Sequence, residues 1–380
     1  MKNIYADHNS NTNIIDDARN AIIDIMEVFG NPSSVHFSGR NIRKHVEKSR
    51  EIISDFLKTQ PKNIIFTSGA SESASWILNG YDGPVIIAGD CHDCLTKPRQ
   101  DAKFIKILSN GQIDKDNLKK LIDECDKDPL VCFMHSNNET GIVQDAKSII
   151  EIIKSMNAYV LCDIVQSSGK IEICDHTLSS DFLIMSSHKI GGPTGVGCAK
   201  ISEKIQIKQL IHGGGQERSF RGGTENIIGI VGFGAAVSKI DHAKYKKVEE
   251  LRNFFEEEIM NGFKTSLIIG KDQIRLPNTT CVAMPGISSE TQVMNFDING
   301  IHISAGSACS SGKVKKSNVL DAMGLSEDIS KSAVRFSFGR DLEKEHIKSI
   351  IDVWNNLYKK YKDRGPPDIS EKFELTAMAV

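Results

Sequence analysis

Lys189 occupies a position where a lysine could do chemistry. It follows the apolar run Phe182–Met185, which predicts a buried strand, and precedes the glycine-rich stretch GGPTGVG. Open α/β sheets bind ligands at the C-terminal ends of their strands. A lysine partly buried there can lose its proton near neutral pH and act as a nucleophile or base. A lone loop lysine is more often a solvated surface residue, so a catalytic role needs support from other groups.

A predicted anion site lies at Ser68–Ser71, between a predicted strand at Asn63–Thr67 and a predicted helix at Ser71–Leu78. Backbone N–H groups at a helix start, together with a serine hydroxyl, bind anions. Simple helix capping by a serine is the alternative. The segment lacks the GK[ST] ending of a P-loop, which argues against a nucleoside triphosphate.

Asp163 ends another predicted strand, Tyr159–Cys162. A buried carboxylate needs a cationic or donor partner, because burial otherwise raises its pKa; a helix cap or an ion pair with a nearby lysine would also explain it. The anion site, Asp163 and Lys189 together fit pyridoxal 5'-phosphate. The phosphate would bind at the helix start, the pyridinium nitrogen at Asp163 and the aldehyde carbon at Lys189.

The chain has nine cysteines, an odd number with irregular spacing, which argues against a disulfide framework. Cys309 lies in the polar, glycine-rich stretch SAGSACSSGKVKKS, where an exposed thiol of lowered pKa is expected. Cys91-x-x-Cys94 could bind a metal or undergo redox chemistry. No second CxxC or histidine pair at zinc spacing accompanies it, so we expect no metal site.

Short apolar strands alternate with amphipathic helices along the first two thirds of the chain, which predicts an α/β fold with a mostly parallel sheet covered on both faces. We expect a large cofactor-binding domain over residues 17–260. Residues 1–16, an irregular arm, and residues 261–380 would form a smaller α+β domain that carries the Cys309 loop, with residues 364–380 as a flexible tail.

The overall composition excludes several classes of function. A net charge of −2 gives no general attraction to nucleic acid or to an anionic membrane. No apolar run approaches the roughly 20 residues of a membrane span. The N-terminal residues lack a signal-peptide core, so we expect a cytoplasmic protein.

Several motifs in order resemble those of the cysteine desulfurases, which are fold-type I pyridoxal phosphate enzymes of the class V aminotransferase group. The resemblance runs from about residue 4 to about residue 355, and the long glycine-rich run after Cys309 is similar to the branch with the long catalytic loop. The motifs are GNPSSVHFSGR, IIFTSGASES, MHSNNETGIVQ, DIVQSSGKI, SSHKIGGPTGVG, HGGGQERSFRGGTEN, SAGSACSSG and SAVRFSFGR.

The resemblance implies a role for each matching residue. Lys189 would form a Schiff base with the cofactor and later act as the Cα base, and Cys309 would accept the sulfur. Asp163 would contact the pyridinium nitrogen and Gln166 the phenolic oxygen, and His92 would stack on the ring. Asn138 would also contact the cofactor. The residues expected to bind the phosphate are Ser186, His188, Ala70 and Ser71. Arg335 and Asn138 would bind the substrate carboxylate. Thr224 would reach the phosphate of a neighbouring subunit, which implies a homodimer.

The implied reaction converts L-cysteine to L-alanine and leaves a persulfide on Cys309. The sulfur would then pass to an acceptor protein, either an iron–sulfur scaffold or a sulfur carrier, for iron–sulfur cluster or thio-cofactor assembly.

The sequence departs from the family pattern at His8 and Ser10 in the arm and at Cys91, where an acidic residue usually precedes the histidine. Two alternatives therefore remain open. One is a related pyridoxal phosphate lyase or aminotransferase, for example one that acts on selenocysteine. The other is a non-enzymatic assembly subunit that binds a sulfur-transfer partner.

Overall fold

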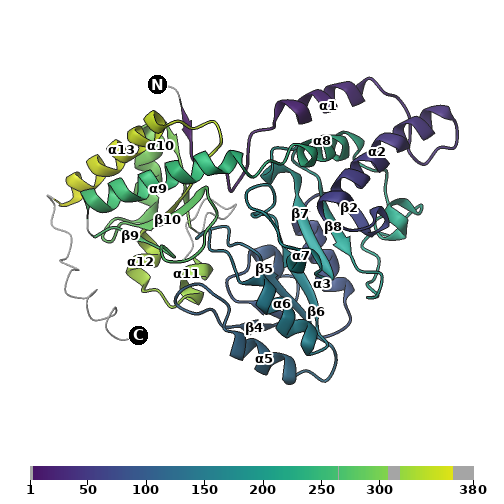
Figure 1. Cartoon of the computed structure of the whole chain (residues 1–380), viewed down its shortest axis with the longest axis horizontal. Coiled ribbons are helices and arrows are strands. Elements are labelled where there is room, and N and C mark those ends of the chain that lie inside the picture. The colour runs from purple at the N-terminus through teal and green to yellow at the C-terminus, as the bar shows by residue number, and fades with distance from the viewer. Residues whose placement is uncertain (1–2, 264, 307–316, 363–380) are drawn as a thin grey trace.

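The computed structural model describes residues 3–263, 265–306 and 317–362. The chain forms two bodies side by side, each with its own sheet and core (Figure 1). Within the described ranges, no helix is both long enough and apolar enough to cross a membrane.

The larger body is built on a seven-stranded sheet with the order β2-β8-β7-β6-β5-β3-β4. Its strands are β2 (Ile64–Thr67), β3 (Val85–Ala88), β4 (Lys103–Ile105), β5 (Leu130–Met134), β6 (Tyr159–Asp163), β7 (Phe182–Ser186) and β8 (Gly197–Ile201). Strand β8 runs antiparallel to both of its neighbours, β2 and β7, and the other pairs in this sheet are parallel. The connection from β7 to β8 is too short for the crossover that a parallel pair requires. The mostly parallel sheet predicted from the sequence is confirmed.

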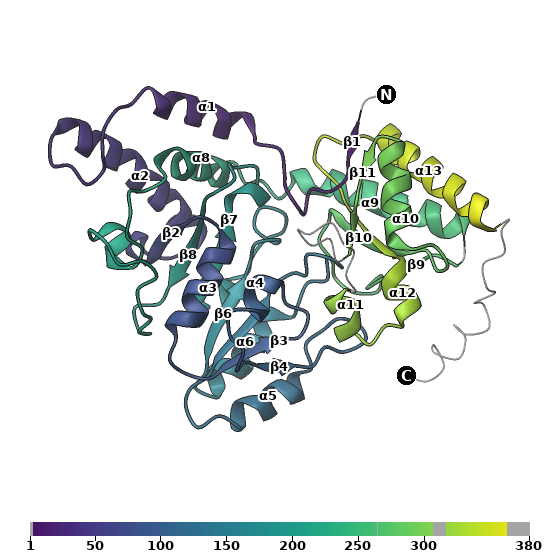
Figure 2. The ribbon, with the colours of Figure 1, turned by 180° about the vertical axis from the view of Figure 1, so that it is seen from behind.

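Helices cover both faces of this sheet: α6 and α7 lie in front of it in Figure 1, and α3 and α4 lie in front of it in the reverse view of Figure 2. Helices α1 and α2 each pack against α8. The helices of this body are α1 (Asp16–Met26), α2 (Phe37–Phe56), α3 (Ala70–Gly80), α4 (Asp93–Thr96), α5 (Lys115–Asp123), α6 (Ala146–Ser155), α7 (Asp175–Leu178) and α8 (Ile227–Ser238).

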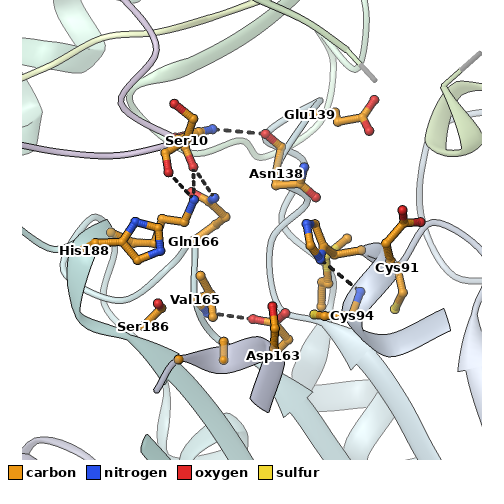
Figure 3. Close-up of a pocket in the computed structure, with 18 of the residues that line it drawn as sticks. Ser10, Cys91, Cys94, Asn138, Glu139, Asp163, Val165, Gln166, Ser186 and His188 are labelled. Carbon is orange, nitrogen blue, oxygen red and sulfur yellow. Dashed lines mark hydrogen bonds between the residues drawn. The ribbon is translucent and has the colours of Figure 1, made fainter. Parts of the chain in front are cut away.

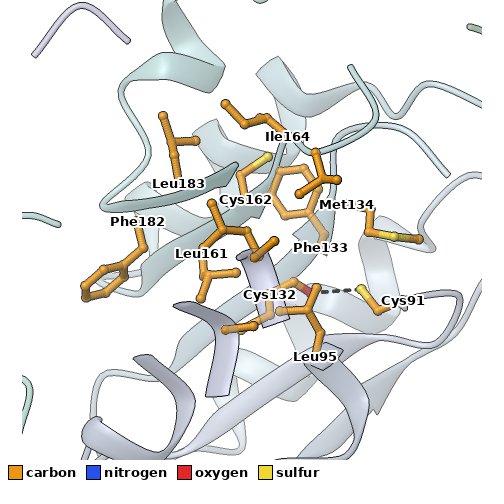
Figure 4. Packing of buried hydrophobic residues seen from close by; sticks show 14 of the residues in the cluster. Cys91, Leu95, Cys132, Phe133, Met134, Leu161, Cys162, Ile164, Phe182 and Leu183 are labelled. Carbon is orange, nitrogen blue, oxygen red and sulfur yellow. Dashed lines mark hydrogen bonds between the residues drawn. The ribbon is translucent and has the colours of Figure 1, made fainter. Parts of the chain in front are cut away.

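The core of the larger body combines side chains from the buried central strands with helix residues such as Leu95 (Figure 4). All five residues of β5 and of β7 are buried, as parallel strands covered on both faces must be. Cys132 and Cys162 have no exposed surface and pack there as small apolar residues.

The smaller body contains an antiparallel sheet of order β12-β13-β10-β9. The strands are β9 (Leu267–Ile268), β10 (Thr279–Ala283), β12 (Ser304–Ala305) and β13 (Ala333–Ser337). The helices are α9 (Lys244–Gly262), α10 (Ser289–Ile298), α11 (Asn318–Ala322), α12 (Glu327–Ser332) and α13 (Lys344–Lys362).

Helix α9 packs with the smaller body, because Phe255 lies in an aromatic cluster with Phe336 (ring centroids 4.8 Å apart) and Trp354. The domain boundary at residue 260 stays a prediction, and the packing of α9 favours a boundary before Lys244.

The N-terminal arm differs from the irregular segment expected. Strand β1 (Ile4–Tyr5) pairs in parallel with β11 (Ile301–His302), and Asp7 forms an isolated bridge with Ser337. These backbone bonds to distant residues hold the following polar residues between the two bodies. The tail expected to be flexible lies outside the described residues.

Candidate active site

A cavity of about 790 Å³ opens at the C-terminal ends of β5, β6 and β7 and is closed on its other side by the smaller body and the arm. In Figure 3, Asp163 and Ser186 lie at the strand ends, and Ser10 and Asn138 lie opposite them. The predicted site residues along this cavity are Ala70, Ser71, His92, Asn138, Asp163, Gln166, Ser186, His188, Lys189 and Arg335.

Lys189 ends the short 3-10 helix η2 (Ser187–Lys189), which follows β7 directly. Its Nζ donates to the backbone oxygens of Asn9 and Ser10, at 2.6 Å each. Burial, reinforced by the nearby positive charge of Arg335, lowers the pKa of the Lys189 amine to about 8. A substantial fraction of this amine is therefore neutral, and nucleophilic, at mildly alkaline pH.

Asp163, at the end of β6, is 6% exposed and accepts a hydrogen bond from the backbone N–H of Val165 at 2.8 Å. Burial raises the pKa of its carboxyl group to about 6, despite the opposing effects of that hydrogen bond and of Lys189. Because the protein offsets little of the cost of burying this negative charge, the carboxylate can pair strongly with a cation in the cavity.

The N-terminus of α3 lies on the cavity wall and provides an anion site. The N-cap residue is Gly69, so no side chain caps the first backbone N–H groups, and Ala70 and Ser71 line the cavity. Glu72 also lies there, but it accepts from the Ser68 N–H (3.0 Å) and pairs with Arg221 (3.0 Å), so its charge is balanced.

Ser186 and His188 extend this site. Ser186 Oγ would lie 3.8 Å from a Cβ placed on Gly69, which brings it close to the start of α3. The Nδ1 atom of His188 lies 3.0 Å from Oδ1 of Asn11, and burial lowers the pKa of His188 to about 4. Because Oδ1 of Asn11 can only accept, Nδ1 of the neutral imidazole donates to it, and only a protonated His188 could also donate from Nε2 to an anion.

Arg335, on β13, reaches the cavity from the smaller body. It pairs with Asp7 (Nη2 to Oδ1, 2.6 Å) and donates to the backbone oxygen of Asn138 at 2.9 Å. The side-chain oxygen of Asn138 and the Nε of Arg335 are buried and have no hydrogen-bond partner among the residues that the structure describes. Unsatisfied polar atoms beside a cavity indicate that a polar ligand completes their bonding.

His92 is the N-cap of α4 and lines the cavity, with its Nδ1 accepting from the Cys94 N–H at 3.1 Å. Burial raises the pKa of the Cys91 and Cys94 thiols, so neither is poised as a thiolate. No cluster of three metal-ligating side chains occurs in the part of the chain that the structure describes.

Two predicted site residues are not brought into this cavity. Thr224 is exposed and does not line it. Cys309 lies outside the described residues, although Gly306 before it and Asn318 after it both line the cavity.

Sequence reasoning missed three residues at or beside the cavity, Asp7, Asn9 and Lys170, and it placed Glu139 in a polar cluster at a strand end without a role of its own. Glu139 is buried, which raises its pKa to about 7, and accepts from Ser317 Oγ at 2.6 Å. Asp7 and Asn9 belong to the N-terminal arm, whose position depends on backbone pairing with strands that lie far away in the sequence. Lys170 had a detectable signal, since it follows Gln166 by four residues and thus shares its face in a helical turn.

These groups fit pyridoxal phosphate. The open N–H groups of α3 suit its phosphate, the poorly compensated carboxyl of Asp163 suits its ring nitrogen, and the buried amine of Lys189 suits its aldehyde.

Comparison with known proteins agrees with this geometry. Residues 4–350 match the family model described as Aminotransferase class-V. The cysteine desulfurase IscS of Dictyoglomus turgidum is 32% identical over 385 residues, covering 96% of this chain and 97% of that protein. The solved NifS-like protein from Rickettsia africae superposes with a TM-score of 0.87 at 32% identity, covering 94% of this chain and 99% of that one.

A structure of SspA in complex with cysteine superposes with a TM-score of 0.76 at 28% identity, covering 88% of this chain and 98% of that one. The expected fold type, that of the pyridoxal phosphate enzymes of fold type I, is thereby confirmed. The chain belongs to the class V aminotransferase family and, within it, to the cysteine desulfurases.

Proposed function

We propose that this protein removes sulfur from L-cysteine with pyridoxal phosphate, giving L-alanine and a persulfide on Cys309. The observation that carries the proposal is the meeting of Lys189, Asp163 and the start of α3 in one cavity, within a chain of the cysteine desulfurase family.

Pyridoxal phosphate, when bound, supplies the electron-withdrawing ring that makes the substrate Cα proton acidic. Asp163 holds a proton at the ring nitrogen, since burial raises the pKa of its carboxyl group to about 6 and no ion pair to it is formed within the described residues. Lys189 binds the cofactor through Nζ and, once displaced, removes the Cα proton with the same atom. A pKa of about 8 suits both tasks, because the amine exchanges its proton near neutral pH.

Arg335 and Asn138 bind the substrate carboxylate. The Nη atoms of Arg335 contact Asn138 and Asp7, and its Nε, which has no hydrogen-bond partner among the described residues, is a further donor beside the cavity. The complex of the related SspA with cysteine supports the same class of substrate here.

Cys309 accepts the sulfur from the substrate and passes it to an acceptor protein, an iron–sulfur scaffold or a sulfur carrier. Its sequence context supports this role, because the surrounding stretch is polar and carries lysines that favour a thiolate. The flanking Gly306 and Asn318, both at the cavity, also support it.

The functional unit is a homodimer in the cytoplasm. Support for a dimer comes from exposed apolar side chains around the connection between α1 and α2, namely Ile23, Met26, Phe29, Val35 and Phe37. Phe29 is 92% exposed, and an apolar side chain so exposed is stabilised when another protein surface covers it. Thr224, exposed on this chain, stays available for a neighbouring subunit. Nine cysteines without a disulfide framework support a reducing compartment.

The test is an assay of sulfide and alanine released from L-cysteine by purified protein with pyridoxal phosphate and a thiol. We expect Lys189→Ala to lose the covalent cofactor link, and Cys309→Ser to keep bound cofactor but lose sulfide release. Cys174→Ser, at an exposed cysteine, is the matched control and should remain active.

Each alternative has its own outcome in this assay. Full activity of Cys309→Ser would show that the persulfide does not form there. Turnover of selenocysteine but not cysteine would identify a selenocysteine lyase. Cofactor binding by the wild type without turnover of any amino acid would identify a non-enzymatic assembly subunit.

A further inference from the structure

Lys170 is a buried lysine beside the active site that the proposed mechanism does not use. It is 2% exposed and does not line the cavity. Its Nζ donates to the side-chain oxygen of Gln166 at 2.6 Å and to the side-chain oxygen of Asn9 at 2.8 Å. Both acceptors are neutral amides.

This environment is unfavourable for a cation. Burial lowers the pKa of Lys170 well below its usual value, and the positive charges of Lys189 and Arg335 lower it further. The charge of Lys170 also acts on His8, another buried titratable group. An apolar side chain of similar length would avoid the cost of burying the amine. A lysine here therefore needs a compensating role.

The hydrogen bond to Gln166 determines which end of its amide faces the cavity. A lysine amine bonded to an amide selects the oxygen, since the amide NH₂ can only donate. The Nε2 of Gln166 is thereby turned towards the arm, where it donates to the backbone oxygen of Asn9 at 2.9 Å. Gln166 itself lines the cavity, so its NH₂ is the group available to a ligand there.

The hydrogen bond from Lys170 to Asn9 fixes the orientation of the Asn9 side-chain amide in the same way. With its oxygen held by Lys170 and by Nδ2 of Asn278 (3.0 Å), Asn9 directs its own NH₂ to the backbone oxygen of Asn138 (3.2 Å) and to Thr279 Oγ1 (2.8 Å). The backbone oxygen of Asn9 accepts from Lys189. One side chain thus joins the arm to both bodies next to the proposed Schiff-base lysine.

We propose that Lys170 is a positioning residue: its Nζ orients Gln166 so that an N–H donor faces the phenolic oxygen of the cofactor, and it anchors Asn9 so that the arm closes the cavity beside Lys189. This role rests on the proposed function, because it concerns the same cofactor.

The first test is the absorption spectrum of the bound cofactor from about pH 6 to about pH 10, a range that brackets the pKa of a perturbed amine or phenol. Lys170→Met keeps the length of the side chain and removes both hydrogen bonds. Loss of the oriented donor should destabilise the deprotonated phenolic oxygen of the cofactor and raise its apparent pKa by about one unit. At a given pH, the ratio of the deprotonated to the protonated form should then fall about tenfold.

A double-mutant cycle identifies the route of this effect. If Lys170 acts through Gln166, then Lys170→Met combined with Gln166→Leu should show the same spectra as Gln166→Leu alone. Lys200→Met is the matched control, because Lys200 is also buried (8% exposed) and donates to two neutral oxygens, those of Leu178 (2.6 Å) and Ser180 (2.9 Å). It should leave the spectra unchanged.

The second test is hydrogen exchange of the cofactor-free protein. The backbone N–H of Asn9 donates to Ser337 Oγ at 2.9 Å, so exchange at that position measures how firmly the arm is held. Lys170→Met should speed exchange across the arm at least tenfold, whereas Lys200→Met should not.

The proposal would be overturned by spectra of Lys170→Met that match the wild type at every pH, or by arm exchange no faster than in Lys200→Met. Additive spectral effects of Lys170→Met and Gln166→Leu would also contradict it. Failure of the wild type to bind pyridoxal phosphate would instead refute the proposed function, and the orientation role with it.

Discussion

The buried amine of Lys189 should make the stability of the cofactor-free protein depend on pH, and Lys189→Met should remove that dependence. The pKa of Lys189 is about 8 in the folded protein, against 10.5 for an unperturbed lysine. Between these values the unfolded chain binds more protons than the folded one, so stability rises with pH. Below about pH 8 the penalty for burying the ammonium is fully present. Methionine carries no proton and has no such penalty.

The size of the effect follows from the two pKa values. A difference of about 2.5 units corresponds to about 3 kcal/mol, most of which is relieved by about pH 10, where the unfolded amine is still partly protonated. At neutral pH the gain from removing the ammonium is offset, because the backbone oxygens of Asn9 and Ser10 each lose a donor worth about 1 kcal/mol. We therefore expect the variant to be about 1 kcal/mol more stable than the wild type at neutral pH and less stable at about pH 10.

The assay is urea unfolding of the cofactor-free wild type and variant at a series of pH values. Lys170 and Lys200 are present in both proteins, so the difference in unfolding free energy reports Lys189 together with the effect of its charge on Lys170. Lys348→Met, at an exposed position on α13, is the control and should leave the pH dependence unchanged. A difference between wild type and Lys189→Met that stays constant across this range would refute the desolvated amine that the structure indicates.

Three further predictions follow from buried charges in the structure. Asp163→Asn should reduce kcat for sulfide release by at least about 100-fold with the cofactor still linked, because an amide cannot hold a proton on the ring nitrogen; a loss of less than tenfold would contradict this. Arg335→Lys should raise KM for cysteine by roughly 10-fold to 100-fold with a smaller change in kcat, because a single ammonium replaces a two-pronged donor; steady-state kinetics with an unchanged KM would contradict it. Arg50→Met should lower the free energy of unfolding in urea by about 3–5 kcal/mol, because it leaves the buried carboxylate of Glu217 without the guanidinium that contacts it at 2.8 and 2.9 Å. Adding Glu217→Met should recover part of the loss. A loss below about 1 kcal/mol would show that the pair is not buried.

Much of the larger body could be predicted because its signals are local. The strand Leu130–Met134 is a continuous apolar run with the same bounds in the structure, and the runs before Asp163 and Lys189 also form buried strands. A parallel sheet brings the ends of such strands to one edge, so polar residues that follow them share a cavity. The order of motifs, recognised as a family pattern, then supplied an expected role for each residue.

The position of the arm could not be predicted from local patterns. Residues 1–16 read as irregular, yet Ile4 pairs with Ile301 and Asp7 with Ser337. These contacts span most of the chain length, and neither hydrophobic period nor turn chemistry encodes them. The Arg335–Asp7 ion pair is hidden from sequence reasoning for the same reason, because its partners come from opposite ends of the chain.

The sequence by itself determined the parallel sheet, the residues at its strand ends and the chemistry those residues share, because apolar runs and the polar residues after them are set by neighbours in the chain. Only the tertiary structure decided how the cavity is closed and how its amine is tuned. Asn9 joins the arm to both bodies, Lys170 orients Gln166, and burial together with Arg335 lowers the pKa of Lys189 to about 8. Burial and long-range charge depend on which distant segments pack together, and that is a property of the folded chain.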